Sequence, residues 1–133
     1  MVERQHSEMT DAIINCFYKV YNSLGYGFLE RVYEKSLLLE LTNNSFKVEV
    51  QKPVKVFYSG EIVGEYFCDL LIEDKVLVEI KATPSILKEH EAQLLNYLKA
   101  TNVEVGLVLN FGPEPQIRRK VFSNKSKSLF APH

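Results

Sequence analysis

Apolar residues near the start of the chain recur every three or four positions, which is the spacing of one face of an α-helix. This pattern predicts a first helix over residues 8–24. Gly25 and Gly27 then favour a turn, and a second helical pattern runs to about Asn43. The chain therefore begins with two helices joined by a glycine-containing loop.

The middle of the chain is rich in β-branched and aromatic residues, which favour β-strands. Three such runs are separated by short turns at residues 59–60 and 73–75, and this arrangement predicts an antiparallel meander. The runs cover residues 48–58, 62–72 and 76–80.

The last third of the chain returns to helix and then to strand. Thr83 as N-cap and Pro84 at the first helical position predict a third helix that ends near Ala100. Residues 103–109 form an apolar run typical of a strand buried on both faces, and residues 116–122 resemble an edge strand. The element order αα-βββ-α-β(β) predicts an α/β fold, with helices flanking a mixed β-sheet.

Length and composition narrow the class of protein. The chain has 133 residues, of which 46% are hydrophobic and 25% charged, so we expect one packed domain over residues 1–133. We expect a cytoplasmic protein without membrane association, because no stretch approaches the roughly 18 apolar residues of a membrane helix. Two cysteines and three scattered histidines suggest neither a disulfide framework nor a zinc site.

Charge is informative mainly at the end of the chain. The net charge of -1 indicates no class of partner, but no acidic residue follows Glu114. The basic C-terminal segment, residues 115–133, could contact phosphates or could be a solvated tail. Its candidate substrate-binding residues are Arg118, Arg119 and Lys120.

Three charged residues stand out in the predicted sheet, where successive side chains alternate between the two faces. Asp69 should share a face with Phe67 and Leu71, and Glu79 should share a face with Lys81. Because apolar residues flank these charges, we expect a covered face. A solvated sheet face is the alternative explanation of the same residues.

The length of the turn decides whether the two carboxylates meet. A three-residue turn pairs Ile72 with Val76 and then places Asp69 opposite Glu79. A two-residue turn would instead oppose Asp69 and Val78, mixing polar with apolar positions on both faces. The hydrophobic pattern therefore favours the three-residue turn.

Two opposed carboxylates destabilise a sheet unless something offsets their charge. A divalent cation with oxygen ligands, Mg²⁺ or Mn²⁺, would do so. Lys81 could hold a water nucleophile or offset negative charge in the transition state. Asp69, Glu79 and Lys81 are therefore candidate catalytic residues for metal-dependent hydrolysis of a phosphodiester.

Four motifs along residues 13–121 resemble those of the GxxExxY proteins, a branch of the PD-(D/E)XK nuclease superfamily. They are Gly27-Phe28-Leu29-Glu30-Arg31-Val32-Tyr33, Asp69 with Glu79-Ile80-Lys81, Gln93-Leu94-Leu95-Asn96-Tyr97, and Asn110-Phe111-Gly112. The resemblance implies a restriction-endonuclease-like core. It also implies that Asp69, Glu79 and the Ile80 carbonyl bind the metal, and that Lys81 acts on the nucleophile.

The resemblance adds further residues to the predicted site. Glu30 would be an additional acidic group that contacts the metal directly or through water, although it could also be a first-turn residue favoured by the helix dipole. Gln93 would reach the attacking water, Lys81 or the substrate. Tyr97 would pack beside Gln93 or serve as a core residue, and Tyr33 is expected to have a supporting or substrate-binding role.

These observations predict a Mg²⁺- or Mn²⁺-dependent nuclease whose partner is nucleic acid; we expect DNA, although the sequence does not decide between DNA and RNA. Two alternatives stay open: a nucleic-acid-binding module that does not cleave, and a protein-interaction subunit of a larger assembly. A homodimer would let so small a nuclease address both strands, but the sequence leaves its oligomeric state open.

Overall fold

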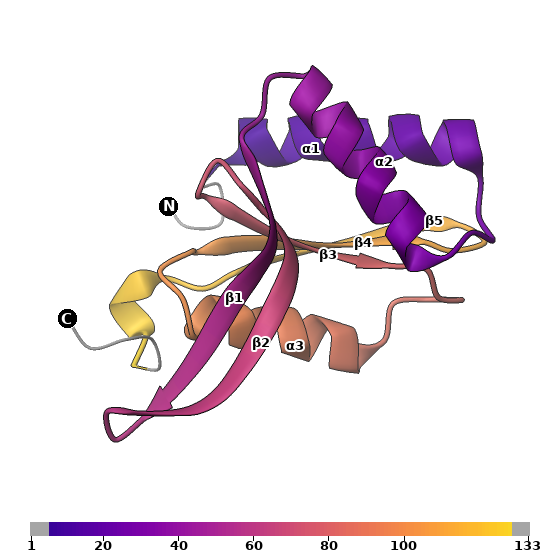
Figure 1. Cartoon of the computed structure of the whole chain (residues 1–133). Helices are drawn as coiled ribbons and strands as arrows, with labels where there is room; N and C mark the ends of the chain where they lie inside the picture. Colours follow the sequence, from indigo (N-terminus) through magenta and orange to yellow (C-terminus); the bar gives the residue numbers. More distant parts are fainter. Residues whose placement is uncertain (1–5, 129–133) are drawn as a thin grey trace.

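The computed structural model describes residues 6–128, which form a five-stranded mixed β-sheet with helices on both faces (Figure 1). This arrangement confirms the predicted α/β class, the predicted element order and a restriction-endonuclease-like core. In chain order the elements are α1 (Ser7–Leu24), α2 (Glu30–Asn43), β1 (Val48–Tyr58), β2 (Glu61–Ile72), β3 (Val76–Lys81), α3 (Lys88–Lys99), β4 (Val105–Phe111), β5 (Pro115–Val121) and the short 3-10 helix η2 (Asn124–Ser126).

The strands follow one another across the sheet in the order β1-β2-β3-β4-β5. Every neighbouring pair is antiparallel except β3 and β4, which are parallel. A parallel pair needs a crossover connection, and α3 provides it. All of β4 is buried, as its continuous apolar run predicts. No helix within residues 6–128 is long and apolar enough to cross a lipid bilayer.

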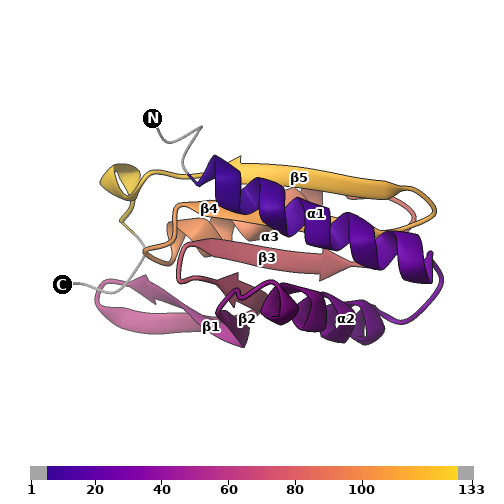
Figure 2. The same ribbon diagram turned by 90° about the horizontal axis from the view of Figure 1, so that it is seen from above.

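The sheet separates two hydrophobic cores. Helices α1 and α2 cover one face and α3 covers the other (Figure 2). On the first side, Ile13 and Phe17 from the amphipathic face of α1 pack with Ile80 of β3. On the second side, Leu94 of α3 packs with Leu77 of β3. Because β3 is covered on both faces, its one buried polar residue, Glu79, lies in a region of low water content.

The predicted start of the third helix is wrong. Helix α3 begins at Lys88 with Leu87 as N-cap, and the imidazole Nδ1 of His90 accepts a hydrogen bond from the Leu87 N–H at 3.0 Å. Thr83 cannot be the N-cap because its hydroxyl donates to the Ser85 carbonyl and its backbone is bound by the side chain of Asn110. The residues between β3 and α3 therefore form a loop held by side chains.

Asn110 organises this loop from the end of β4. Its side chain is fully buried, its Oδ1 accepts from the Thr83 N–H at 2.9 Å, and its Nδ2 donates to the Thr83 carbonyl at 3.0 Å and to Gln116 Oε1 at 3.2 Å. A Cβ at Gly112 would lie 2.4 Å from the Thr83 carbonyl oxygen, so only glycine fits there. Asn110 also pairs in the sheet with Lys81, so this network fixes the chain that follows Lys81.

The strict alternation of faces predicted for β2 is also wrong, because it breaks at Asp69. Cys68 and Leu71 both pack on the α3 side, whereas alternation would place them on opposite faces. Across from Asp69, Gln51 of β1 has a φ of 50° and leaves the regular pairing. The β1–β2 hairpin therefore bends toward the α3 side (Figure 1), and Phe67 is 54% exposed instead of covering the charges.

We predict that Asn110→Ala lowers the free energy of unfolding by about 1–3 kcal/mol, because it leaves backbone groups of Thr83 without partners. Urea denaturation followed by circular dichroism measures this loss. Asn102→Ala is the matched control, since Asn102 lies exposed in the turn after α3. Equal stability of the two variants would contradict the role given to Asn110.

Candidate active site

The turn between β2 and β3 has the predicted three-residue length. It pairs Ile72 with Val76, Leu71 with Leu77 and Leu70 with Val78. This confirms the register that the hydrophobic pattern favours. One step further along, the two strands bring Asp69 and Glu79 together.

At this step the backbone pairing of the two strands is replaced by bonds from side chains. The backbone N–H of Asp69 donates to Glu79 Oε1 at 3.1 Å, and the N–H of Ile80 donates to Asp69 Oδ2 at 2.8 Å. Each carboxylate thus binds the backbone of the opposite strand. The acidic pair, Asp69 and Glu79, lies where β2 stops pairing with β3 and the hairpin bends away.

Glu79 is the electrostatically costly member of the acidic pair. Glu79 is only 5% exposed. Burial and then the negative charge of Asp69 raise its pKa to about 7. The Cys68 thiol, the Asp69 N–H and the Lys81 ammonium oppose this rise. Proton uptake or a cation would relieve the repulsion between the two carboxylates.

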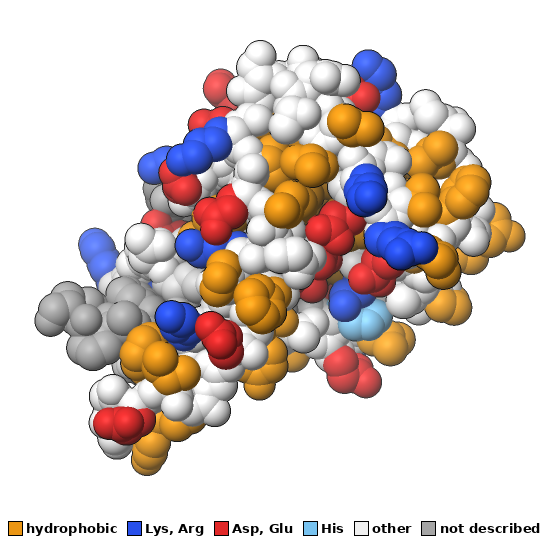
Figure 3. All heavy atoms as spheres, viewed as in Figure 1, with side chains coloured by type: hydrophobic (Ala, Val, Ile, Leu, Met, Phe, Trp, Pro, Cys, Tyr) orange, Lys and Arg blue, Asp and Glu red, His pale blue; other side chains and the backbone are white. Residues whose placement is uncertain are grey.

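Glu30 approaches the acidic pair from the first turn of α2. Loss of water raises its pKa most; the Lys81 charge opposes this, and Asp69 raises the pKa further. The backbone N–H of Ala82 lowers the pKa of Glu30 slightly. In the space-filling view, acidic and basic side chains mix on the molecular face between α2 and α3 (Figure 3). Glu30, Asp69 and Lys81 are thus close enough to influence one another.

Helix α3 presents Gln93 and Tyr97 four residues apart, and Tyr97 packs in one cluster with Cys68, the residue before Asp69. Gln93 and Tyr97 both line a hollow of about 420 Å³ with Tyr66 of β2 and Asn96. Tyr97 packs in the core below α3, and its pKa is raised by burial first and then by the Glu79 charge. Tyr97 is therefore a core residue that also lines the hollow with Gln93, and its supporting role in a site stays a prediction.

Tyr33 supports the loop that precedes Glu30. Its ring is fully buried, its hydroxyl donates to the Gly25 carbonyl at 2.7 Å, and it accepts from the Phe28 N–H at 3.2 Å. The ring stacks on Phe111 with centroids 4.3 Å apart. Of the two roles predicted for Tyr33, these contacts favour support over substrate binding.

The basic residues of the C-terminal segment lie away from the acidic pair, on the edge strand β5. Arg118 and Lys120 both pair with Glu91 of α3, with N–O distances of 3.6 Å and 2.7 Å, and Arg119 also has an interaction partner. Residues 115–121 form a strand rather than a tail; residues 129–133 lie outside the described part. Binding of phosphate by Arg118 or Lys120 would have to compete with Glu91.

Gln51 is a neighbour of the site that the sequence reasoning missed. Its Nε2 donates to Glu34 Oε2 of α2 at 3.1 Å and to Asp69 Oδ1 at 3.4 Å. The available signal was the pair of consecutive polar residues Gln51-Lys52, which interrupts the alternation of valines with polar residues along this strand. That signal does not reveal the partner, because the backbone irregularity of β1 at Gln51 sets its position opposite Asp69.

The donor set suits a hard divalent cation. Asp69 and Glu79 offer carboxylate oxygens, and Ile80 adds a backbone carbonyl beside them. Within residues 6–128, no group of three or more His, Cys, Asp or Glu side chains is spaced to hold a metal ion. The fit therefore rests on the repulsion inside the acidic pair and on the oxygen chemistry of its neighbours.

Comparisons with known proteins give a family and a fold. A family model described as the PD-(D/E)XK nuclease superfamily matches residues 7–120. Among solved structures, "Crystal structure of SSO0001" is similar, with a TM-score of 0.57 and 21% identity over 92% of this chain and 61% of that chain. At this identity the likeness concerns the fold alone, and this chain spans 61% of the other's length. A search of curated proteins found no match.

We predict that Glu79→Gln changes the pH dependence of stability in metal-free protein. A raised pKa in the folded state contributes stability that is present below about pH 4.5 and is lost as the pH rises through about 7. Between pH 5 and 8, wild type should lose up to about 3 kcal/mol more than Glu79→Gln. Urea denaturation in EDTA at several pH values measures the difference.

Glu61→Gln is the matched control, because Glu61 is exposed at the start of β2. It should follow wild type. An identical pH dependence of wild type and Glu79→Gln would refute the electrostatic account of the acidic pair.

Proposed function

The chain belongs to the PD-(D/E)XK nuclease superfamily, whose members generally use divalent metal ions, and from this premise we propose that it is a metal-dependent nuclease acting on DNA. The observation that supports the proposal most strongly is the acidic pair at the point where β2 and β3 separate. We further propose that the chain belongs to the GxxExxY branch, on the motifs that end at Tyr33 and Gly112.

In this proposal Asp69 and Glu79 hold Mg²⁺ or Mn²⁺ with the Ile80 carbonyl, and Glu30 contacts the ion directly or through water. When bound, such an ion supplies positive charge and makes a coordinated water easier to deprotonate. The buried position of Glu79 supports this assignment, because charge repulsion inside the pair is strongest where water is scarce.

The other residues of the proposed site orient groups and balance charge. Lys81 follows Glu79 by two positions in β3, and its charge is felt by both Glu79 and Glu30. Its ammonium would hold the nucleophilic water or stabilise negative charge on the phosphate in the transition state. Gln93 would orient the water or the substrate from the facing helix α3.

We predict that Asp69→Asn and Lys81→Ala each reduce Mg²⁺- or Mn²⁺-dependent cleavage by at least about a hundredfold, because the first weakens metal binding and the second removes positive charge at the reacting phosphate. Labelled single-stranded, duplex and branched DNA, separated on denaturing gels, measure cleavage rates. An RNA of the same sequence tests the preference for DNA.

Asp74→Asn and Lys75→Ala are matched controls in the exposed turn between β2 and β3, and both variants should cleave like wild type. Cleavage that persists in EDTA, or that is equal in site variants and controls, would rule out the proposed site. DNA binding without cleavage under any metal condition would favour a binding module instead.

A further inference from the structure

The hollow that Gln93 and Tyr97 line is uncharged. It has a volume of about 420 Å³ and lies between the β1–β2 hairpin and α3. Tyr66, Gln93, Asn96 and Tyr97 surround it, together with the apolar side chains of Val56 and Ala100. The described residues that line it include no charged side chain, so it suits a neutral ligand.

The exposed groups in the hollow suit a flat ligand with hydrogen-bonding edges. Tyr66 is 49% exposed, and its ring lies 5.9 Å from that of Tyr97 at an angle of 42°, so much of its surface is open to a further ring. The amide groups of Gln93 and Asn96 each carry donors and an acceptor. Within residues 6–128, neither amide has a hydrogen-bond partner. A nucleobase has this combination of aromatic face and polar edge.

The hollow also adjoins the proposed reaction centre. Tyr66, which lines it, lies three residues before Asp69 in β2. Tyr97 lines it from α3 and packs in one cluster with Cys68, the residue next to Asp69. A base in the hollow would therefore bring its own sugar and phosphates toward the acidic pair. In a duplex the edges of the bases are paired and their faces stacked, so only an unpaired or extruded base could enter.

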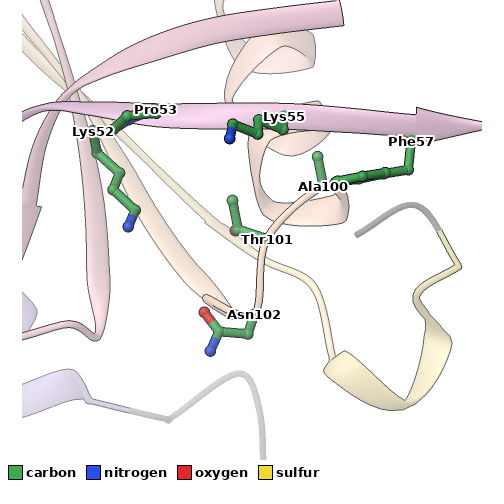
Figure 4. Close-up of a pocket in the computed structure, with 7 residues that line it drawn as sticks. All are labelled: Lys52, Pro53, Lys55, Phe57, Ala100, Thr101 and Asn102. Carbon is green, nitrogen blue, oxygen red and sulfur yellow. The ribbon is translucent and has the colours of Figure 1, made fainter. Parts of the chain in front are cut away.

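A neighbouring hollow offers the positive charge that a nucleic-acid backbone needs. It measures about 590 Å³, and Lys52 and Lys55 of β1 lie there opposite Thr101 and Asn102 (Figure 4). Ala100 lines both hollows. Lys55 makes no ion pair within residues 6–128, so it can attract phosphates. Lys52 makes a long ion pair with Glu49, with an N–O distance of 3.9 Å, so a phosphate would compete with that carboxylate.

We propose that the hollow formed by Tyr66, Gln93, Asn96 and Tyr97 binds one unpaired nucleobase next to the bond that is cleaved. The preferred substrate is then single-stranded nucleic acid. Tyr66 stacks on the base and Asn96 binds its edge. The position of the base next to a cleaved bond rests on the proposed function. Binding of the base itself requires no metal.

Binding in EDTA tests the inference separately from cleavage. Fluorescence anisotropy compares binding of the 133-residue chain to a labelled single strand, to the same strand paired as duplex, and to the same strand with abasic sites. Wild type should bind the intact single strand about tenfold more tightly than the abasic strand, because stacking on an aromatic side chain contributes that much per base.

Tyr66→Ala should weaken binding of the intact strand about tenfold and abolish the preference over the abasic strand. Tyr66→Phe should keep both, since the ring remains. Tyr58→Ala is the matched control, because Tyr58 is 71% exposed near the tip of the same hairpin and lines neither hollow. Circular dichroism confirms that each variant is folded.

The inference is overturned if wild type binds the abasic strand as tightly as the intact one, if Tyr66→Ala binds like Tyr58→Ala, or if no single strand binds. Metal-dependent cleavage that survives any of these results would leave the proposed function standing. Base-dependent binding without cleavage in Mg²⁺ or Mn²⁺ would support the inference and overturn the proposed function alone.

Discussion

The site depends on the exchange of hydrogen bonds between Asp69 and Glu79, whose carboxylates each bind the backbone of the other's strand. This exchange joins β2 and β3 for one step beyond their last backbone pair, Leu70 with Val78. Beyond it the hairpin bends away and opens the space that α3 faces. The same exchange forces two carboxylates together beside a buried strand, and the resulting repulsion is what a divalent cation would relieve.

Contacts elsewhere in the fold fix the positions of three segments around the acidic pair. Tyr33 fixes the loop before Glu30, so that α2 begins near the acidic pair. Asn110 binds the backbone of Thr83 and fixes the chain after Lys81. Helix α3 connects the parallel strands β3 and β4 and thereby brings its polar face under the bent hairpin. Each support comes from a different part of the sequence.

The sequence predicted those features that depend on local pattern. Periodicity located the helices, and the match between Ile72 and Val76 selected the hairpin register. Prediction from the sequence failed where a residue distant in the chain determines the local structure. Asn110, 27 residues away, prevents a helix from starting at Thr83, and the irregular backbone of Gln51 breaks the alternation of faces at Asp69. Neither effect leaves a periodic signal. The predicted roles of individual site residues stay predictions.

Anomalous diffraction from crystals soaked with Mn²⁺ tests most directly whether the acidic pair binds a metal ion. We expect one Mn²⁺ peak in contact with the carboxylates of Asp69 and Glu79 and with the Ile80 carbonyl, and we expect Asp69→Asn to abolish this peak. A metal site at the acidic pair would be ruled out if saturating Mn²⁺ leaves the pair without a peak, or if Mn²⁺ binds only elsewhere and is unaffected by Asp69→Asn.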